Sequence, residues 1–567
     1  MLGKKLRVVI VGGVACGPKT ASRIKRLLPD AEVTIIEKGE LLSYAGCGLP
    51  FYLSGEVHDY KELMSTAAGV VRDTHFFKMT KDITVLNQTL VESIDRNKKT
   101  IKAVHTLSGK SIDIEYDKLV LAVGGTPFIP QIKGIDLKGV HFLSTIDDAR
   151  KIHDEEKNLK GKNAVIIGGG LIGIEVCESF VKQGMNVTII EKMDRVLPAL
   201  LDPEMAYHVH NELQANNVTV LLNDAVVEIK GDDQGNVRSV KTNKTEVPSD
   251  LVLIAIGTKP NITLAKQAGI TIGTTGAIAV NEFLCTSDPD IYAGGDCVEN
   301  IHLVSGKPIY APMGSTANKH GRVIANNICG KESTFKGVLG TAICKVFTMN
   351  VARTGLSEEQ ARDGGYDFIT VLNPSQDKAH FYPDAKLIII KLIVDKKSRT
   401  LLGAQIVGPG DVAKRIEVVI TTITNKATID DIANYDLAYA PPFSPAIDNI
   451  IMTAYIALNK LDGITKSISP VEVKKKMGNN EDFILLDVRS PQEYEEIRID
   501  DTRVKLIPLG KLRESLHQLD KSKEIITFCK ISLRGYEAQR ILEGAGFRNV
   551  KFLDGGIVCW PYKKLVK

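Results

Sequence analysis

The sequence of 567 residues lacks any pair of cysteines at a short spacing, and its nine cysteines are scattered along the chain. That distribution fits a reducing cytoplasm better than a disulfide framework. The sequence also lacks a dense run of lysine or arginine, its net charge is only +4, and it has no hydrophobic run long enough to span a membrane. These absences predict a cytoplasmic protein that binds neither nucleic acid nor membranes.

What the chain does contain is a composition typical of a soluble globular protein, with 44% hydrophobic and 25% charged residues. Its length allows about four domains of roughly 150 residues each. We therefore expect a cytoplasmic protein of several domains and of the size of an enzyme.

A glycine-rich turn near the N-terminus indicates a nucleotide site. The apolar run at residues 7–11 leads into the turn at residues 12–17 and then into a helical stretch. A second apolar strand ends at Glu37, which lies twenty residues beyond Gly17. At this spacing a pyrophosphate rests on the helix N-terminus and the acid accepts hydrogen bonds from ribose hydroxyls.

The same plan recurs at residues 165–191, where the pattern G-x-G-x-x-G is complete and the second strand again ends at a glutamate. A further pair of segments, residues 116–124 and 249–257, repeats as a buried strand that runs into a glycine. Two full copies of strand, turn, strand and acid predict that the chain binds two nucleotides. The residues predicted to bind them are Gly12, Gly13, Gly17, Glu37, Gly168, Gly170, Gly173, Glu191 and Gly257.

A third element, residues 286–296, reads as a loop, a short strand and a terminal acid, Asp296. In this order, over about residues 5–455, the pieces resemble the flavoprotein disulfide reductases that contain two dinucleotide folds. The resemblance implies FAD at the first turn, NADH or NADPH at the second, and Asp296 on the FAD ribityl chain. It also implies a homodimer, because in that family the domain matching residues 336–458 completes the partner's active site.

Cys47 stands alone within residues 43–52, with no second cysteine two or five residues away. Its oxidised form must therefore be a mixed disulfide, a persulfide or a sulfenic acid. Gly46 and Gly48 let the backbone bend sharply and let a flat ligand approach the sulfur. Pro50 is suited to the first turn of a helix, which would place the sulfur near the positive helix end and favour the thiolate.

The lone cysteine leaves two reaction types open within the family. NADH oxidases and peroxidases, which cycle through sulfenic acid, typically carry a histidine at the position of Ala15. The run at residues 47–50 instead resembles coenzyme A disulfide reductases and persulfide or polysulfide reductases. That resemblance implies coenzyme A disulfide, coenzyme A persulfide or polysulfide as substrate, with Tyr439 and Tyr382 of the partner subunit acting on the reacting sulfur. The residues predicted to bind the substrate are Arg23, Lys25, Arg26 and Ser43.

A separate C-terminal module carries a second candidate thiol. A strand at residues 525–528 stops at Cys529, and the six-residue loop that follows opens a helix, with Lys530 and Arg534 nearby. Backbone N–H groups and cations in such a loop favour an anion and a thiolate. The loop, with the Asp-Val-Arg segment before it and Asp-Gly-Gly after it, resembles the rhodanese family, whose loop cysteine carries a persulfide. Ser532 replaces a common glycine, and the usual Gly-His-Ile segment is absent.

The predicted fold class is α/β, with two Rossmann-like dinucleotide-binding domains, an α+β dimerisation domain and a C-terminal α/β rhodanese-like domain. Its predicted bounds are 1–145 and 280–335 for FAD, 146–279 for NAD(P)H, 336–458 for dimerisation and 468–567 for the rhodanese-like module. We predict a reductase in which Cys529 passes sulfane sulfur to coenzyme A or to Cys47 if the linker around 461–468 lets them meet. No metal site is predicted. Two alternatives stay open: an NADH oxidase or peroxidase, and a non-catalytic sulfur carrier.

Overall fold

The computed structural model describes residues 5–156 and 160–566. The chain forms two compact units, Met1–Lys192 with Asn217–Val338, and Met193–Asn216 with Leu339–Lys567. The predicted domain bounds cross this division at residues 193–216, and they stay predictions. Of the four five-stranded sheets in the described part of the chain, three contain only parallel strand pairs and one is antiparallel. This arrangement agrees with the predicted α/β class.

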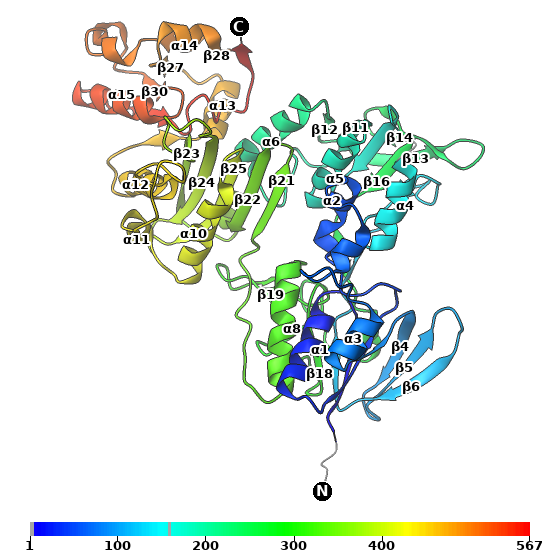
Figure 1. Ribbon diagram of the computed structural model, residues 1–567. Helices are drawn as coiled ribbons and strands as arrows, with labels where there is room; N and C mark the ends of the chain where they lie inside the picture. The colour runs from blue at the N-terminus through cyan, green and yellow to red at the C-terminus, as the bar shows by residue number, and fades with distance from the viewer. Residues whose placement is uncertain (1–4, 157–159, 567) are drawn as a thin grey trace. The chain divides into compact units, whose positions relative to one another are not determined.

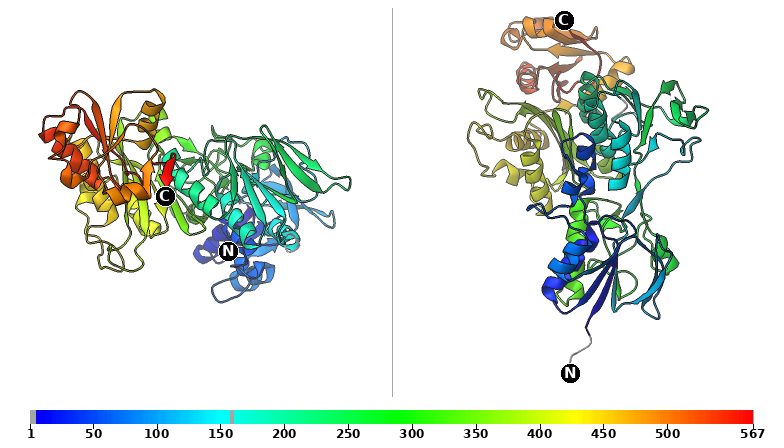
Figure 2. Two further views of the ribbon diagram at one scale, coloured as in Figure 1. Left: turned by 90° about the horizontal axis from the view of Figure 1, so that it is seen from above. Right: turned by 45° about the vertical axis from the view of Figure 1, so that its right-hand side comes forward.

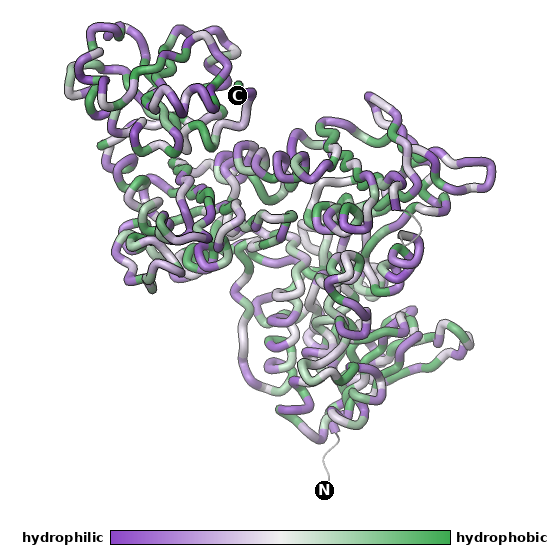
Figure 3. Tube along the Cα trace, turned by 45° about the horizontal axis from the view of Figure 1, so that its top comes forward, coloured by the Kyte–Doolittle hydropathy of each residue, from purple (hydrophilic) through white to green (hydrophobic). Residues whose placement is uncertain are grey.

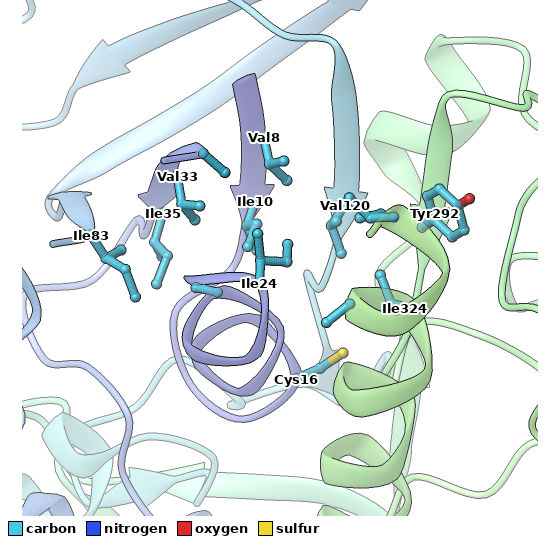
Figure 4. Packing of buried hydrophobic residues seen from close by; sticks show 14 of the residues in the cluster. Val8, Ile10, Cys16, Ile24, Val33, Ile35, Ile83, Val120, Tyr292 and Ile324 are labelled. Carbon is cyan, nitrogen blue, oxygen red and sulfur yellow. The ribbon is translucent and has the colours of Figure 1, made fainter. Parts of the chain in front are cut away.

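The first sheet of the first unit is parallel, and its strands are short apolar runs buried on both faces. Helices α1 and α8 lie side by side against one face (Figures 1 and 2). Between them and the sheet is a core that includes Ile10, Ile24 and Ile324, seen in Figure 4. The elements are β18 (Ile291–Ala293), β7 (Lys118–Leu121), β1 (Arg7–Val11), β2 (Glu32–Ile36), β3 (Thr84–Leu86), α1 (Cys16–Leu27) and α8 (Gly314–Ile328).

The second sheet of this unit repeats the first in order and direction around its central strand β10. Each sheet is also covered on its other face by a three-stranded antiparallel meander. The repeat seen in the sequence motifs thus extends over whole domains, although the meanders were not predicted. The elements are β12 (Thr219–Leu221), β11 (Asn186–Ile190), β10 (Asn163–Ile167), β16 (Leu251–Ile254), β9 (Val140–His141), α5 (Leu171–Lys182), and the meanders β4 (Thr89–Asp95), β5 (Thr100–His105), β6 (Ser111–Glu115) and β13 (Val226–Gly231), β14 (Val237–Thr242), β15 (Glu246–Pro248).

Shorter elements complete the first unit and connect its two sheets. They are α2 (Leu49–Leu53), α3 (Thr74–Lys81), α4 (Ile146–Glu156), α7 (Thr263–Gln267), the 3-10 helices η1 (Gly46–Gly48) and η2 (Tyr60–Met64), and the strands β8 (Gly125–Pro127), β17 (Thr258–Pro260), β19 (Asn300–Ile301) and β20 (Pro308–Ile309). The predicted helix at Pro50 is confirmed as α2, which has that proline in its first turn.

The second unit begins with an antiparallel sheet in the order β21-β22-β25-β24-β23. Helices α10 and α12 pack on it, and α6 meets β25 and β21. Lys391, fully buried on β24, donates to Asp202 and Glu204 at the start of α6, which ties that helix to the sheet. The elements are β21 (Ala342–Val346), β22 (Met349–Gly355), β23 (Phe368–Gln376), β24 (Leu387–Asp395), β25 (Leu401–Gly408), α6 (Pro203–Ala215), α9 (Glu358–Asp363), α10 (Val412–Thr424), α11 (Ile429–Ala433) and α12 (Asn449–Leu461).

The C-terminal module is a parallel sheet in the order β26-β31-β30-β27-β29, with apolar clusters on both faces. Its first strand, β26, already contains two residues of the expected tether at residues 461–468. The elements are β26 (Ser467–Ile468), β27 (Phe483–Asp487), β28 (Ile497–Ile499), β29 (Val504–Leu506), β30 (Glu524–Phe528), β31 (Val550–Leu553), β32 (Lys564–Val566), α13 (Pro470–Gly478), α14 (Pro491–Glu496), α15 (Leu533–Gly544), η3 (Leu509–Lys511) and η4 (Leu516–Gln518).

A buried ion pair holds this module on the antiparallel sheet. The Lys460 ammonium on α12 donates to Asp554 at 2.7 Å and to the Thr370 carbonyl at 2.6 Å, and Ser467 also donates to Asp554. Both charged side chains are less than one tenth exposed. The expected tether is therefore held at both ends, so a freely swinging C-terminal module is not what this structure has.

Hydrophobic stretches are short throughout the chain and are interrupted by hydrophilic residues, as the tube in Figure 3 shows. Within residues 5–156 and 160–566, no helix combines the length and the apolar character that crossing a membrane requires.

Candidate active site

The two glycine turns have matching geometry. In the first, the N–H of Gly12 donates to the Ile36 carbonyl and the N–H of Gly13 donates to the Glu37 carboxylate at 2.7 Å. In the second, the N–H of Gly169 donates to the Glu191 carboxylate at 2.8 Å. Each acid is thus held at the end of the second strand, beside the turn, where the spacing in the sequence predicts a ribose partner.

Close approach of backbone explains the glycines that open and close the first turn. Gly12 has φ +114°, and a Cβ there would lie 2.1 Å from the Ala122 carbonyl oxygen. A Cβ at Gly17 would lie 1.9 Å from the Gly12 carbonyl oxygen. Gly168 and Gly173 meet the same obstacles in the second turn. At Gly170, by contrast, the nearest atom would be 3.9 Å away, which leaves room for a ligand at the start of α5.

The residues at the first turn fit a flavin dinucleotide. Asp296 follows β18, the sheet neighbour of β7, and its half-buried carboxylate makes no hydrogen bond to another described residue. Burial raises the pKa of this carboxyl above its ordinary value, as expected for an acid placed to accept a ligand hydroxyl. The turn supplies backbone N–H groups at the N-terminus of α1 for a pyrophosphate. These residues would hold FAD, with Asp296 in its predicted role on the ribityl chain.

Cys47 lies in η1, immediately before α2, and its side chain is exposed. A Cβ at Gly48 would lie 2.4 Å from a Leu63 methyl carbon, whereas nothing lies within 4 Å of a Cβ at Gly46. The open side of the turn is therefore the side of Gly46. The predicted position of the sulfur before the first turn of a helix is what the structure shows, and its redox role stays a prediction.

Helix α2 is fixed to the nucleotide helix α5. The Ser179 hydroxyl donates to the Pro50 carbonyl at 2.8 Å, and Gln183 donates to the Leu53 carbonyl at 3.3 Å. Lys182 pairs with Glu56 at 2.5 Å just beyond α2. Any shift of α5 on nucleotide binding would therefore also move α2 and the Cys47 segment next to it.

Glu175 is a candidate residue that the sequence analysis missed. It lies one helical turn before Ser179 on α5, and therefore on the face that meets α2. Burial raises the pKa of its carboxyl to about 7, which places its titration in the physiological range. The available signal was its place two residues after Gly173, where a carboxylate interrupts the apolar run at residues 171–177.

The four predicted substrate-binding residues differ in availability. Lys25 donates to the Ala31 carbonyl at 3.0 Å and to Asp82 at 2.9 Å, and also contacts the Pro29 carbonyl. Because its ammonium already has these partners, Lys25 is the weakest candidate of the four for binding a substrate phosphate. Arg23 donates to Asn326, and Arg26 is exposed. Ser43 has φ +49° and its N–H donates to the Gly13 carbonyl, so it bridges the cysteine segment and the first turn.

Tyr439 lines a pocket of about 730 Å³ in the second unit, and its side chain is 52% exposed. Lys414 and Phe443 line the same pocket. Tyr382 is not among the lining residues, but Lys378, which does line the pocket, lies 5.6 Å above the Tyr382 ring. Tyr439 therefore lines this pocket and Tyr382 lies beside one of its lysines, and the lining combines lysines, aspartates and aromatic rings.

Cys529 directly follows β30, as predicted, but it is only 1% exposed. Ser532 has φ +90° in the loop, a conformation that glycine adopts without strain, which explains why glycine is common there. Arg534, expected to face the sulfur as a cation, is held in a two-point ion pair by Glu493, at 2.8 and 2.6 Å. The loop is therefore less cationic than the sequence suggested, and Glu493 is a second residue that sequence reasoning missed.

Two dinucleotide turns on duplicated α/β domains, with a single exposed cysteine on a segment bound to the second nucleotide helix, define a two-nucleotide oxidoreductase of sulfur compounds. Residues 6–309 match the pyridine nucleotide-disulphide oxidoreductase family, residues 341–451 its dimerisation domain and residues 469–562 the rhodanese-like domain. The chain belongs to the pyridine nucleotide-disulphide oxidoreductase family. The predicted family, fold class and cofactors, FAD and NAD(P)H, are confirmed.

Three known proteins show how far the similarity extends. The chain is 38% identical over 452 residues to an NAD(P)H coenzyme A polysulfide/persulfide reductase of Pyrococcus horikoshii, covering 80% of this chain and 98% of that protein. It is 34% identical over 456 residues to an NADH oxidase of Methanocaldococcus jannaschii, covering 80% and 99%. The solved structure of an NAD-dependent persulfide reductase from A. fulgidus is 46% identical with a TM-score of 0.93, covering 98% of this chain and 100% of that one.

Proposed function

We propose that this protein is an NAD(P)H-dependent flavoprotein reductase of coenzyme A persulfide, coenzyme A disulfide or polysulfide, with Cys47 as its redox-active thiol. The observation that carries the proposal is the lone, exposed Cys47 on a turn anchored to the nucleotide helix. The similarity to a persulfide reductase over 98% of the chain, the rhodanese-like module included, supports it.

Cys47 acts as the nucleophile on the sulfur–sulfur bond of the substrate. Its thiolate attacks the inner sulfur of a coenzyme A persulfide, hydrosulfide leaves, and a mixed disulfide forms between Cys47 and coenzyme A. Two electrons and a proton then release the coenzyme A thiol and restore the thiolate. When bound, the flavin supplies the relay that carries those electrons from NAD(P)H. The sum is NADH, a proton and the persulfide giving NAD⁺, the thiol and hydrogen sulfide.

The turn around Cys47 prepares the thiol for this step. Cys47 lies directly before α2, and the bend at Gly46 leaves the sulfur open to a large substrate. The exposed Arg26 on α1 would meet a phosphate of coenzyme A, with Arg23 beside it and Lys25 contributing least. Ser43 would hold the cysteine segment against the first turn through its backbone N–H.

Tyr439 would donate a proton or hydrogen bond to the leaving sulfur, and Tyr382 would assist from beside the same pocket. In a homodimer these tyrosines would serve the partner subunit's thiol, and the match to a dimerisation domain supports that arrangement. Tyr439→Phe keeps the ring, so a role in catalysis predicts a lower kcat at unchanged stability. An unchanged kcat would make Tyr439 a packing residue.

The main alternative is an NADH oxidase or peroxidase that cycles Cys47 through sulfenic acid, and a relative that is named an NADH oxidase favours testing it. Against it stands Ala15, which occupies the place of the usual histidine in the first turn. The experiment offers NADH with oxygen, hydrogen peroxide, coenzyme A disulfide, coenzyme A persulfide and polysulfide, and follows NADH loss and sulfide release. Turnover confined to oxygen or peroxide would contradict the proposal.

The Glu191 carboxylate predicts a preference for NADH, because it accepts ribose hydroxyl hydrogen bonds and repels a 2′-phosphate. We expect a larger kcat/KM for NADH than for NADPH, and Glu191→Ala should narrow the ratio. An equal or larger kcat/KM for NADPH in the unmutated protein would contradict this assignment.

A further inference from the structure

The charge around Cys529 is set by a residue of the preceding helix. Glu493 lies on α14, and its two carboxylate oxygens accept from the two terminal nitrogens of Arg534, in the first turn of α15. The ion pair lowers the pKa of Glu493 to about 2. Arg534 also hydrogen-bonds Cys529. Both partners raise the pKa of the Arg534 guanidinium, and Glu493 raises it more than Cys529 does. The carboxylate therefore offsets the positive charge that stands beside the buried sulfur.

Glu493 is held in place by contacts other than this ion pair. Its backbone N–H donates to the Ser490 hydroxyl, and its carboxylate accepts from the Ser490 N–H, which is the capping box of α14. Its backbone carbonyl accepts from Arg489, whose guanidinium is buried against Asp487. The Asp-Val-Arg segment thus helps to hold the helix that carries this acid, and a rotation of the Glu493 side chain that opens the ion pair would also break its bond to the Ser490 N–H.

The loop exposes two apolar side chains and the cation Lys530. Cys529 is 1% exposed, whereas Ile531 is 39% exposed and Leu533 is 60% exposed. An alkyl persulfide joins its reactive outer sulfur to an alkylthio group and brings at most one negative charge there. Thiosulfate brings a sulfonate next to its reactive sulfur, and Arg534 is already paired.

Resting on the proposed function for the role of the module, we infer that Glu493 is a specificity-determining residue that makes the Cys529 loop accept alkyl persulfides in preference to thiosulfate. In the reaction, the Cys529 thiolate attacks the outer sulfur of R–S–SH, the sulfur–sulfur bond breaks, and R–S⁻ leaves. Cys529 then carries the sulfane sulfur and the proton. With thiosulfate, the same attack releases sulfite, whose two charges need the cation that Glu493 occupies.

The test measures sulfur transfer to cyanide by the full-length holoprotein without NADH, following thiocyanate. The two donors are thiosulfate and the persulfide of N-acetylcysteamine, an uncharged thiol, and Cys529→Ala supplies the background at other thiols. Glu493→Gln keeps the capping box and frees Arg534. A charged hydrogen bond to the released guanidinium should raise kcat/KM for thiosulfate about tenfold or more. The persulfide value should stay within about threefold.

Two further variants separate specificity from loop structure. Glu496→Gln on the same helix changes the net charge equally, and its carboxylate accepts from Gln492 instead of Arg534, so it should leave the donor ratio unchanged. Glu493→Gln with Arg534→Gln should lose the thiosulfate gain. Equal losses with both donors in Glu493→Gln, or an unchanged donor ratio, would overturn the inference and make Glu493 a structural residue.

Reduction of coenzyme A disulfide by NADH, measured on the same proteins, reports the Cys47 reaction separately. Absence of NADH-dependent reduction of coenzyme A disulfide, coenzyme A persulfide and polysulfide alike in the unmutated protein would contradict the proposed function. The donor ratio in the cyanide assay would still decide the inference about Glu493, because it needs neither NADH nor Cys47.

Discussion

The two candidate thiols of this chain differ in almost every physical respect. Cys47 is exposed on a glycine-flanked turn, whereas Cys529 is buried inside a loop and lies beside the Arg534–Glu493 pair. Cys47 belongs to a segment bound to a nucleotide helix, and Cys529 belongs to a module pinned through Lys460 to an antiparallel sheet. The exposure of Cys47 suits the redox exchange with a large substrate that we propose for it, and the burial of Cys529 suits the single sulfur atom that we propose it carries.

The largest expected effect comes from breaking the Lys460–Asp554 ion pair, which holds the C-terminal module on the antiparallel sheet. Lys460→Met leaves Asp554 buried without its cation, and removing one partner of a buried pair costs about 3–5 kcal/mol. We expect early unfolding of the C-terminal module in urea, followed by fluorescence of its one tryptophan, Trp560. Reduction at Cys47 should persist. Lys466→Met, at an exposed position nearby, is the control, and equal stability of the two variants would contradict the pin.

Next in size is a pH effect beside the open site. Because burial raises the pKa of Glu175 to about 7, the folded protein holds a proton that the unfolded chain loses near pH 4.5. This acid therefore lowers stability as pH rises from about 4.5 to 7, by an amount of the order of 2 kcal/mol. Glu175→Gln should gain stability relative to the unmutated protein across that window. Thermal unfolding at pH 5, 6, 7 and 8 measures the difference, and a flat difference would contradict it.

A smaller effect is expected where α2 meets α5. Ser179→Ala removes a buried hydrogen bond to the Pro50 carbonyl and leaves that carbonyl without this donor, at a cost of about 1–2 kcal/mol. We expect lower kcat with disulfide substrates, with FAD retained and sulfur transfer from Cys529 unchanged. Gln183→Ala, which removes a longer bond to the same helix, should have a weaker effect. Loss of both activities together would argue for general destabilisation.

The smallest effect concerns strain in the closed loop. Ser532→Gly relieves a left-handed backbone at φ +90°, for a gain of about 1 kcal/mol that is partly offset by its lost bond to the Leu553 carbonyl. Ser515→Gly, at φ −101°, relieves no such strain and should be neutral or destabilising. Urea midpoints of the module compare the two. A less stable Ser532→Gly protein would show that the hydroxyl matters more than the backbone.

The sequence predicted the parts of this molecule that follow from local spacing. The glycine turns, the acids Glu37 and Glu191, and the helix at Pro50 depend on residues close together in the chain, and the structure has them where expected. Contacts between distant segments could not be predicted in this way. Glu493 meets Arg534 across 41 residues and Lys460 meets Asp554 across 94, and neither pairing leaves a periodic signal.

The positive charge that the sequence predicts around Cys529 shows the same limit. Lys530 and Arg534 were read as cations because they stand next to the cysteine in the sequence. The structure adds the acid from another helix that offsets one of them. Likewise, the carboxyl of Glu175 gains its importance from burial against neighbouring elements, which no single stretch of sequence records.

The most direct test of the central claim mixes NADH and then coenzyme A persulfide with Cys47→Ser and with the unmutated protein, and follows flavin absorbance in a stopped-flow instrument. Serine leaves the nucleotide turns intact but forms no mixed disulfide. The account predicts that NADH bleaches the flavin in both proteins, and that the persulfide restores the oxidised spectrum rapidly only where Cys47 is present. Restoration at the same rate in Cys47→Ser would contradict the assignment of Cys47 as the redox-active thiol.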